Sequence, residues 1–195
     1  VLLAGLALLF VITRFWRITT LPSGVHIDEA GMAYDAWCLS QYGVDRYFKS
    51  YPLLLTNFGG GGQSALCIYT TALLFRLFGF HSFLFRVTNI FYSLLTVVFG
   101  MLILRKLYPD RPYLAIAGGY LMTILPFFIL SARLGMDCHP ILGTSTVFIY
   151  CFLCALQSEK YRYYVLAGIT GGIVLYTYSC LLYTSPSPRD RSLSR

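Results

Sequence analysis

The segment that decides the fold class is Val87–Leu104, which reads VTNIFYSLLTVVFGMLIL and contains no charged side chain. Two basic residues, Arg105 and Lys106, follow it directly. A transmembrane helix needs about 20 consecutive, predominantly apolar residues, and Lys and Arg are enriched in the cytoplasmic loops beside such helices. The segment therefore predicts a helix that crosses a membrane.

Three other segments have the same apolar character, namely Tyr113–Leu130, Ile141–Leu156 and Tyr164–Ser179. The whole chain of 195 residues is 57% hydrophobic and only 12% charged, whereas soluble domains are about 25% charged. We therefore predict an all-α fold, a polytopic bundle of transmembrane helices. The shorter stretch Val1–Thr13 predicts the end of a first transmembrane helix, and Arg14–Arg17 after it predicts an anchor in the lipid interface.

The segment Ser64–Phe80 leaves the topology open, because it is apolar but short and contains Arg76. If it does not cross the membrane, five basic residues of the later loops share one side: Arg105, Lys106, Arg111, Lys160 and Arg162. The positive-inside rule favours that arrangement, with residues 64–80 interfacial or re-entrant. The bundle then has a long extracytoplasmic first loop, residues 14–63, that carries interfacial helices.

The final residues, 180–195, change to a composition rich in Ser, Pro and Arg. We interpret them as an adapter-derived or disordered tail, and we expect residues 1–179 to be the N-terminal part of a transmembrane domain. The formal net charge is +7, but Lys and Arg form no stripe, so we predict no nucleic-acid partner. A modest positive charge suits anionic lipid or lipid phosphate instead.

Two adjacent carboxylates, Asp28 and Glu29, follow the first apolar stretch. Residues Asp28–Tyr42 predict a helix, on which Asp28 and Asp35 share one face because they are seven residues apart. We expect this helix to lie in the membrane interface, with apolar side chains in lipid and carboxylates toward water. Adjacent residues of a helix point about 100° apart, so Asp28 and Glu29 need not serve the same group.

Four patterns follow one another in the chain: Asp28-Glu29; Tyr42–Tyr47 (YGVDRY) with Pro52 and Tyr69 after it; Phe78–Phe80 leading to Phe85–Val87; and Ser131–Asp137 (SARLGMD). In this order they resemble the C-type (GT-C) glycosyltransferase superfamily, with a likeness that covers roughly residues 5–179. Within it, the chain is similar to the protein O-mannosyltransferases and to the aminoarabinose transferases that act on lipid A (glycosyltransferase family 39). Members are polytopic membrane enzymes.

The resemblance implies a glycosyltransferase that moves a sugar from a polyprenyl-phosphate donor to an acceptor hydroxyl on the extracytoplasmic face, with inversion. Such a transfer needs a base for the hydroxyl and cations for the phosphate. The resemblance makes Asp28 the general base and Glu29 a second catalytic residue, which orders the acceptor or the loop. Arg86 and Arg133, at the outer ends of spans, are candidates to bind the donor phosphate. Asp137 is a candidate to line the cavity.

Each of these assignments has a structural alternative. The two adjacent acids can cap an interfacial helix, and the two arginines can extend toward lipid headgroups. Arg133 can also pair with Asp137, one helical turn away.

We expect no cofactor, because the lipid-phosphate-linked sugar is itself the co-substrate. We assign no metal ligand, because the spacing of Asp137 and His139 matches no rule for a metal site, and the sequence leaves metal dependence open. The expected partners are that donor, membrane lipid, and an acceptor that is a protein, a lipid or a cell-envelope polymer. The implied location is the bacterial cytoplasmic membrane, with the active site facing outward, and a fragment of such an enzyme is expected to be inactive alone.

Two other functions compete with the enzyme. One is a transporter or flippase fragment in which the same charges line a permeation path, and the other is a non-catalytic membrane scaffold. Transporters commonly carry ionisable residues near the midplane in a repeated arrangement. Here the charges gather at span ends, and the sequence contains no evident repeat, so the enzyme is favoured.

Overall fold

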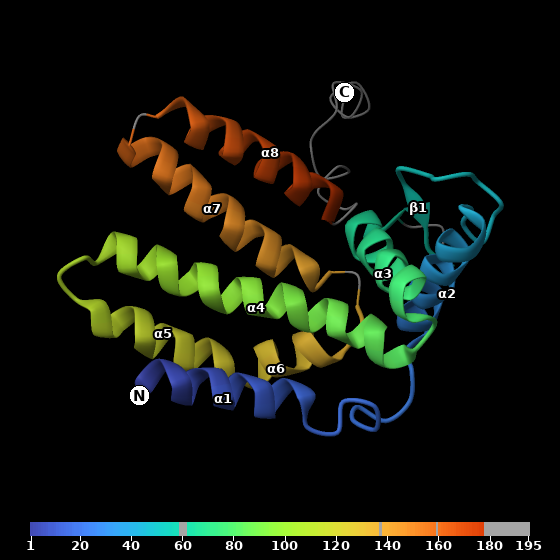
Figure 1. Ribbon diagram of the computed structural model, residues 1–195, viewed down its shortest axis with the longest axis horizontal. Coiled ribbons are helices and arrows are strands. Elements are labelled where there is room, and N and C mark those ends of the chain that lie inside the picture. The colour runs from blue at the N-terminus through green and yellow to red at the C-terminus, as the bar shows by residue number, and fades with distance from the viewer. Residues whose placement is uncertain (59–61, 137, 159, 178–195) are drawn as a thin grey trace, which may run out of the picture.

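The protein is a helix bundle with one short β-hairpin, and a computed structural model describes its residues 1–58, 62–136, 138–158 and 160–177 (Figure 1). In chain order the elements are α1 (Leu2–Phe15), α2 (Ile27–Tyr42), β1 (Leu55–Thr56), β2 (Gly62–Gln63), α3 (Ala65–Phe78), α4 (Ser82–Leu107), α5 (Pro112–Ile124), α6 (Pro126–Arg133), α7 (Pro140–Ser158) and α8 (Tyr161–Thr177). The all-α fold class is therefore confirmed.

Helices α4 and α7 form the centre of the bundle, where they pack against each other (Figure 1). Within the described residues, α4 has 26 residues and α7 has 19, and both are long and apolar enough to cross a membrane. The predicted spans Val87–Leu104 and Ile141–Leu156 are thus confirmed as helices of sufficient length. The predicted span Tyr164–Ser179 falls mostly in α8, but its last two residues lie outside the described part of the chain.

The predicted span Tyr113–Leu130 is not one straight helix. It consists of α5 and α6, which are bent by 60° and together pass as a third candidate span. Pro126 has no backbone N–H, and its ring disfavours the helical conformation at Leu125, whose ψ is 128°. The predicted span is therefore broken at this proline.

Arg14 binds the carbonyl groups that this break leaves without partners. Pro126 cannot donate to the carbonyl of Met122, and Arg14 donates to that oxygen at 3.1 Å and to the carbonyl of Thr123 at 2.5 Å. The Arg14 side chain is fully buried. The prediction that residues 14–17 anchor in the lipid interface was wrong for Arg14, because the helix break offers this side chain acceptors inside the bundle.

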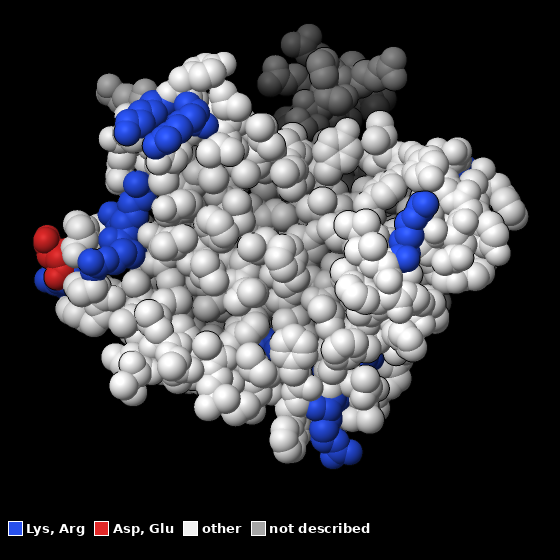
Figure 2. Space-filling model, viewed as in Figure 1, with Lys and Arg blue, Asp and Glu red and all other residues white. Residues whose placement is uncertain are grey.

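The two ends of the bundle differ in character. The α4–α5 and α7–α8 turns lie at one end, whereas α2, α3 and the hairpin lie at the other (Figure 1). Basic side chains gather at the first end, on the left of Figure 2, where the two turns and the helix ends beside them contain Arg105, Lys106, Arg111, Lys160 and Arg162. These five residues lie at the end opposite α2 and the hairpin (Figure 1), which is the arrangement expected if residues 64–80 do not cross the membrane.

Helix α3 is short and lies beside the N-terminal half of α4. Its 14 residues make it about 21 Å long at 1.5 Å per residue, which is less than the ~30 Å hydrocarbon core of a bilayer. Thr71 of α3 donates to Thr88 of α4 at 3.1 Å. This position fits an interfacial or re-entrant segment, which remains a prediction.

Helix α2 begins after the cap residue His26 and ends where Gly43 adopts a left-handed φ of 69°. One of its faces packs into a buried apolar cluster with α3, β1 and the start of α4, and the cluster includes Met32, Ala36, Leu39, Leu55, Ile68, Phe75 and Phe85. The predicted helix Asp28–Tyr42 is thus confirmed. Its apolar face packs largely against other parts of the protein.

Candidate functional site

Asp28 lies in the first turn of α2, at the end of the bundle opposite the basic turns. His26 accepts a hydrogen bond from the backbone N–H of Asp28 through Nδ1 at 3.3 Å, so it caps the helix. The Asp28 side chain is 26% exposed, and its Oδ1 accepts from Nδ2 of Asn57 at 2.9 Å. Its Oδ2 lies 3.4 Å from Nδ1 of His26. The carboxylate is therefore contacted by an amide and an imidazole and keeps access to solvent.

Glu29 points away from Asp28 and into the protein, as the rotation between adjacent helical residues predicts. Its Oε1 accepts from Nε of Arg86 at 2.9 Å, and each of these side chains is 5% exposed. Arg86 also donates to three backbone carbonyls of the segment that links α1 to α2, those of Ile18, Pro22 and Gly24. The ion pair therefore orders that segment beneath the first turn of α2.

The end of the SARLGMD pattern lies against the same ion pair. A Cβ atom placed on Gly135 would lie 2.8 Å from Cγ of Glu29 and 2.0 Å from the ring of Phe85, so only glycine permits this close approach. Asp137, predicted to line the cavity, lies outside the described residues. The structure thus brings three of the four patterns together at Glu29.

Arg133 is half-buried and binds the end of α1. Its guanidinium donates to the carbonyls of Thr13 at 3.1 Å, Trp16 at 2.6 Å and Leu21 at 3.0 Å. A cation at this position satisfies carbonyl groups that a helix C-terminus leaves unpaired. A donor phosphate would have to compete with these acceptors, and phosphate binding by Arg86 and Arg133 stays a prediction.

The second acidic residue on the Asp28 face of α2, Asp35, is 1% exposed and bound by Arg46. Nε of Arg46 donates to both carboxylate oxygens at 2.9 Å, and its backbone N–H donates to Oδ1 at 3.0 Å. The prediction that the carboxylates of α2 face water was wrong for Glu29 and Asp35. Burying a carboxylate is costly unless it is paired, and each of these two has an arginine partner.

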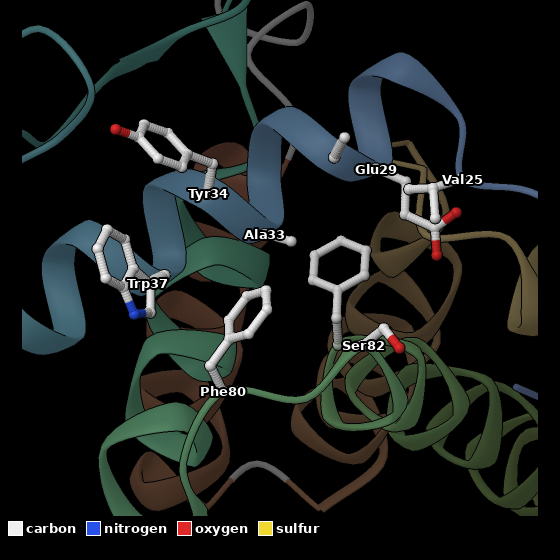
Figure 3. A pocket seen from close by; sticks show the side chains of 9 residues that line it. Val25, Glu29, Ala33, Tyr34, Trp37, Phe80 and Ser82 are labelled. Carbon is white, nitrogen blue, oxygen red and sulfur yellow. The ribbon is translucent and has the colours of Figure 1, made fainter.

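An open, largely apolar pocket of about 500 Å³ lies between α2 and the start of α4. Its lining includes Val25, Glu29, Ala33, Trp37, Phe80 and Ser82. Figure 3 shows the α2 side chains on one side of this space and Phe80 and Ser82 on the other. Asp28 is not among the lining residues, because it faces the hairpin instead.

Neither Asn57 nor Gln63 was singled out by the sequence. Both belong to or adjoin the hairpin, and the only signal was a polar amide on each side of the glycine run. In the part of the chain that the structure describes, no group of three or more His, Cys, Asp or Glu side chains could hold a metal ion.

These features define a class: a polytopic, all-α integral membrane protein in which the acidic residues of α2 and their arginine partners lie together at one end of the bundle (Figure 1). A family model described as dolichyl-phosphate-mannose-protein mannosyltransferase matches residues 63–187, and the chain belongs to this family. Membership indicates a membrane glycosyltransferase that uses a lipid-linked sugar donor and an acceptor. Arg86 and Arg133 lie inside the matched range, whereas Asp28 and Glu29 precede it. No curated protein and no solved structure matches the chain.

Proposed function

We propose that this chain forms part of a membrane enzyme that transfers a sugar from a polyprenyl-phosphate donor to an acceptor hydroxyl. In this proposal the reaction occurs on the extracytoplasmic face and inverts the anomeric centre, with Asp28 as the general base. The acceptor oxygen attacks the anomeric carbon, its proton passes to Asp28, and the bond to the phosphate oxygen breaks. Polyprenyl phosphate leaves with the electron pair of that bond.

One observation carries the assignment of the base: of the three acidic residues of α2, Asp28 alone has no arginine partner in the described residues. Glu29 and Asp35 are each paired with a buried arginine, so neither carboxylate is free to accept a proton from the acceptor hydroxyl. Asp28 is partly exposed, and among the described residues its carboxylate contacts the amide of Asn57 and, at 3.4 Å, Nδ1 of the cap residue His26. A general base needs both solvent or substrate access and a free lone pair, and Asp28 meets both requirements.

The two predicted phosphate ligands differ in how well they suit that role. Arg133 is half-buried, so we retain it as the proposed ligand of the donor phosphate. Arg86 is 4% exposed and bound to Glu29 and three carbonyls, so we propose that it acts indirectly by fixing the segment 18–24. The apolar pocket beside α2 suits part of the isoprenoid chain of such a donor.

The test compares wild type with Asp28→Asn, each expressed in membranes. The measurement is the release of polyprenyl phosphate from labelled polyprenyl-phosphate sugars, with the mannose donor first. We expect Asp28→Asn to be slower by a factor of about 10² or more, because it keeps the shape and removes the base. Asp110→Asn is the matched control, since Asp110 is an exposed acid in the α4–α5 turn at the opposite end.

Two results would count against the proposal. Equal turnover by wild type and Asp28→Asn would show that Asp28 is not the base. Failure of the wild type to consume any donor across a panel of sugars would favour the transport function instead.

A further inference from the structure

A continuous series of hydrogen bonds leads from the Asp28 carboxylate into the protein. Asn57 donates from Nδ2 to Asp28, and Gln63 donates from Nε2 to Oδ1 of Asn57 at 3.1 Å. Arg46 donates in turn to Oε1 of Gln63 at 3.3 Å, and the same guanidinium binds Asp35. The series therefore joins two carboxylates on the same face of α2, the partly exposed one of Asp28 and the buried one of Asp35.

The two charged ends of the series fix the orientation of both amides. A guanidinium can only donate hydrogen bonds, so Gln63 must present its oxygen to Arg46 and its nitrogen to Asn57. Asn57 then accepts through Oδ1, which also receives the backbone N–H of Phe58 at 2.7 Å. Its only remaining polar group is the NH₂ group, and this donor points at an ionised carboxylate, which can only accept.

The hairpin and the ion pair hold this series rigidly. Gln63 is 1% exposed and pairs with Leu55 in the antiparallel hairpin, and Asn57 directly follows β1. The Arg46 guanidinium lies 4.1 Å from the centre of the Phe58 ring. Gly31 of α2 allows this packing, because a Cβ there would lie 2.8 Å from Phe58 and 2.9 Å from Arg46.

From this geometry we infer that Asn57 is a positioning residue for Asp28, held in place by Gln63, Arg46 and Asp35. The inference rests on the proposed function, because it concerns the base of that reaction. A carboxylate at a helix start has free rotation about two side-chain bonds, and the Asn57 donor selects one orientation. Reaction rates depend steeply on the placement of the reacting groups, so a base that is loosely held is a slower base.

The experiment is a double-mutant cycle in the donor-turnover assay with wild type, Asn57→Ala, Asp28→Asn and the double variant. We expect Asn57→Ala to lower kcat by about 10-fold with little change in the donor KM, because a misplaced reacting group slows the chemical step more than it weakens binding. On the Asp28→Asn background, the same change should cost less than 2-fold, because no base remains to be positioned.

Two further variants separate positioning from a loss of folding. Asn57→Asp keeps the shape and the acceptor oxygen but places a second carboxylate against Asp28, and we expect it to lower kcat at least as much as Asn57→Ala. Gln41→Ala removes an exposed amide from the end of α2 and should leave kcat within 2-fold of wild type. Equal amounts of folded protein in the membrane are confirmed by size-exclusion chromatography after solubilisation.

The outcomes distinguish this inference from the proposed function. If Asp28→Asn is slow but Asn57→Ala keeps the wild-type kcat, or costs the same factor on both backgrounds, Asn57 does not act through Asp28 and the inference fails alone. If Asp28→Asn turns over like wild type, the proposed base fails and the positioning role is overturned with it.

Discussion

Breaking the buried ion pair between Glu29 and Arg86 should destabilise the protein strongly. Both side chains are 5% exposed, and Oε2 of Glu29 has no hydrogen-bond partner among the described residues. The buried negative charge of Glu29 is therefore balanced mainly by the Arg86 guanidinium. Removing one partner of a buried pair leaves an uncompensated charge and costs about 3–5 kcal/mol. For a chain of this size, each kcal/mol lowers Tm by about 2–4 °C, which gives a loss of about 6–20 °C.

The assay is thermal unfolding of the purified protein in detergent, followed by the fluorescence of its two tryptophans. Arg86→Met should give the larger loss, because it strands Glu29 and also releases the three carbonyls that Arg86 binds. Glu29→Leu should give a smaller loss, since Arg86 keeps those carbonyls. Arg17→Met is the control, because Arg17 is an exposed arginine of the same connecting segment and should change Tm little.

The double variant Glu29→Leu/Arg86→Met decides whether the pair is coupled. It buries no charge, so its Tm should lie at or above that of Arg86→Met alone. If instead Glu29→Leu lowers Tm by the same amount in the wild type and in Arg86→Met, the two side chains do not interact as described. Losses below 2 °C for both single variants would likewise refute the reasoning.

Three other predictions follow from the same end of the bundle. Gly31→Ala should lower Tm because its Cβ would meet the side chains of Phe58 and Arg46, at a cost of about 1–3 kcal/mol. Gly172→Ala is the control, because its Cβ would meet nothing within 4 Å and its Tm should not fall. Equal Tm values for the two variants would contradict the packing at Gly31. Arg133→Gln should raise the donor KM by about 10-fold if Arg133 binds the phosphate, whereas the control Arg17→Gln should leave the KM unchanged. An unchanged KM in Arg133→Gln would show that Arg133 serves only to bind the end of α1. Burial, and to a lesser degree the nearby Asp35 charge, raises the pKa of the Cys38 thiol, so at pH 7 its reactive thiolate should be scarce. Maleimide labelling of Cys38 should therefore be slow at pH 7 and faster at higher pH, and labelling at the rate of an exposed cysteine would refute this.

The apolar runs were enough to predict the two long helices α4 and α7, because a bilayer demands length and hydropathy that can be read directly from a sequence. The helix α2 was also predictable, since its acidic first turn and the Gly43 stop are local signals. The break at Pro126 was visible as a residue, but its consequence was not, because Arg14 that binds the freed carbonyls is 108 residues away in the chain.

The roles of the acidic residues could only be divided by the tertiary structure. Sequence alone placed Asp28 and Glu29 side by side and Asp35 on the face of Asp28, and it determined that at least two of them must point in different directions. Which carboxylate is neutralised depends on arginines from other segments. Arg86 of α4 forms an ion pair with Glu29, and Arg46, between α2 and β1, forms one with Asp35. The cost of burying a charge is set by such long-range partners, so only the folded chain decides that Asp28 is the acid of α2 without an arginine partner among the described residues.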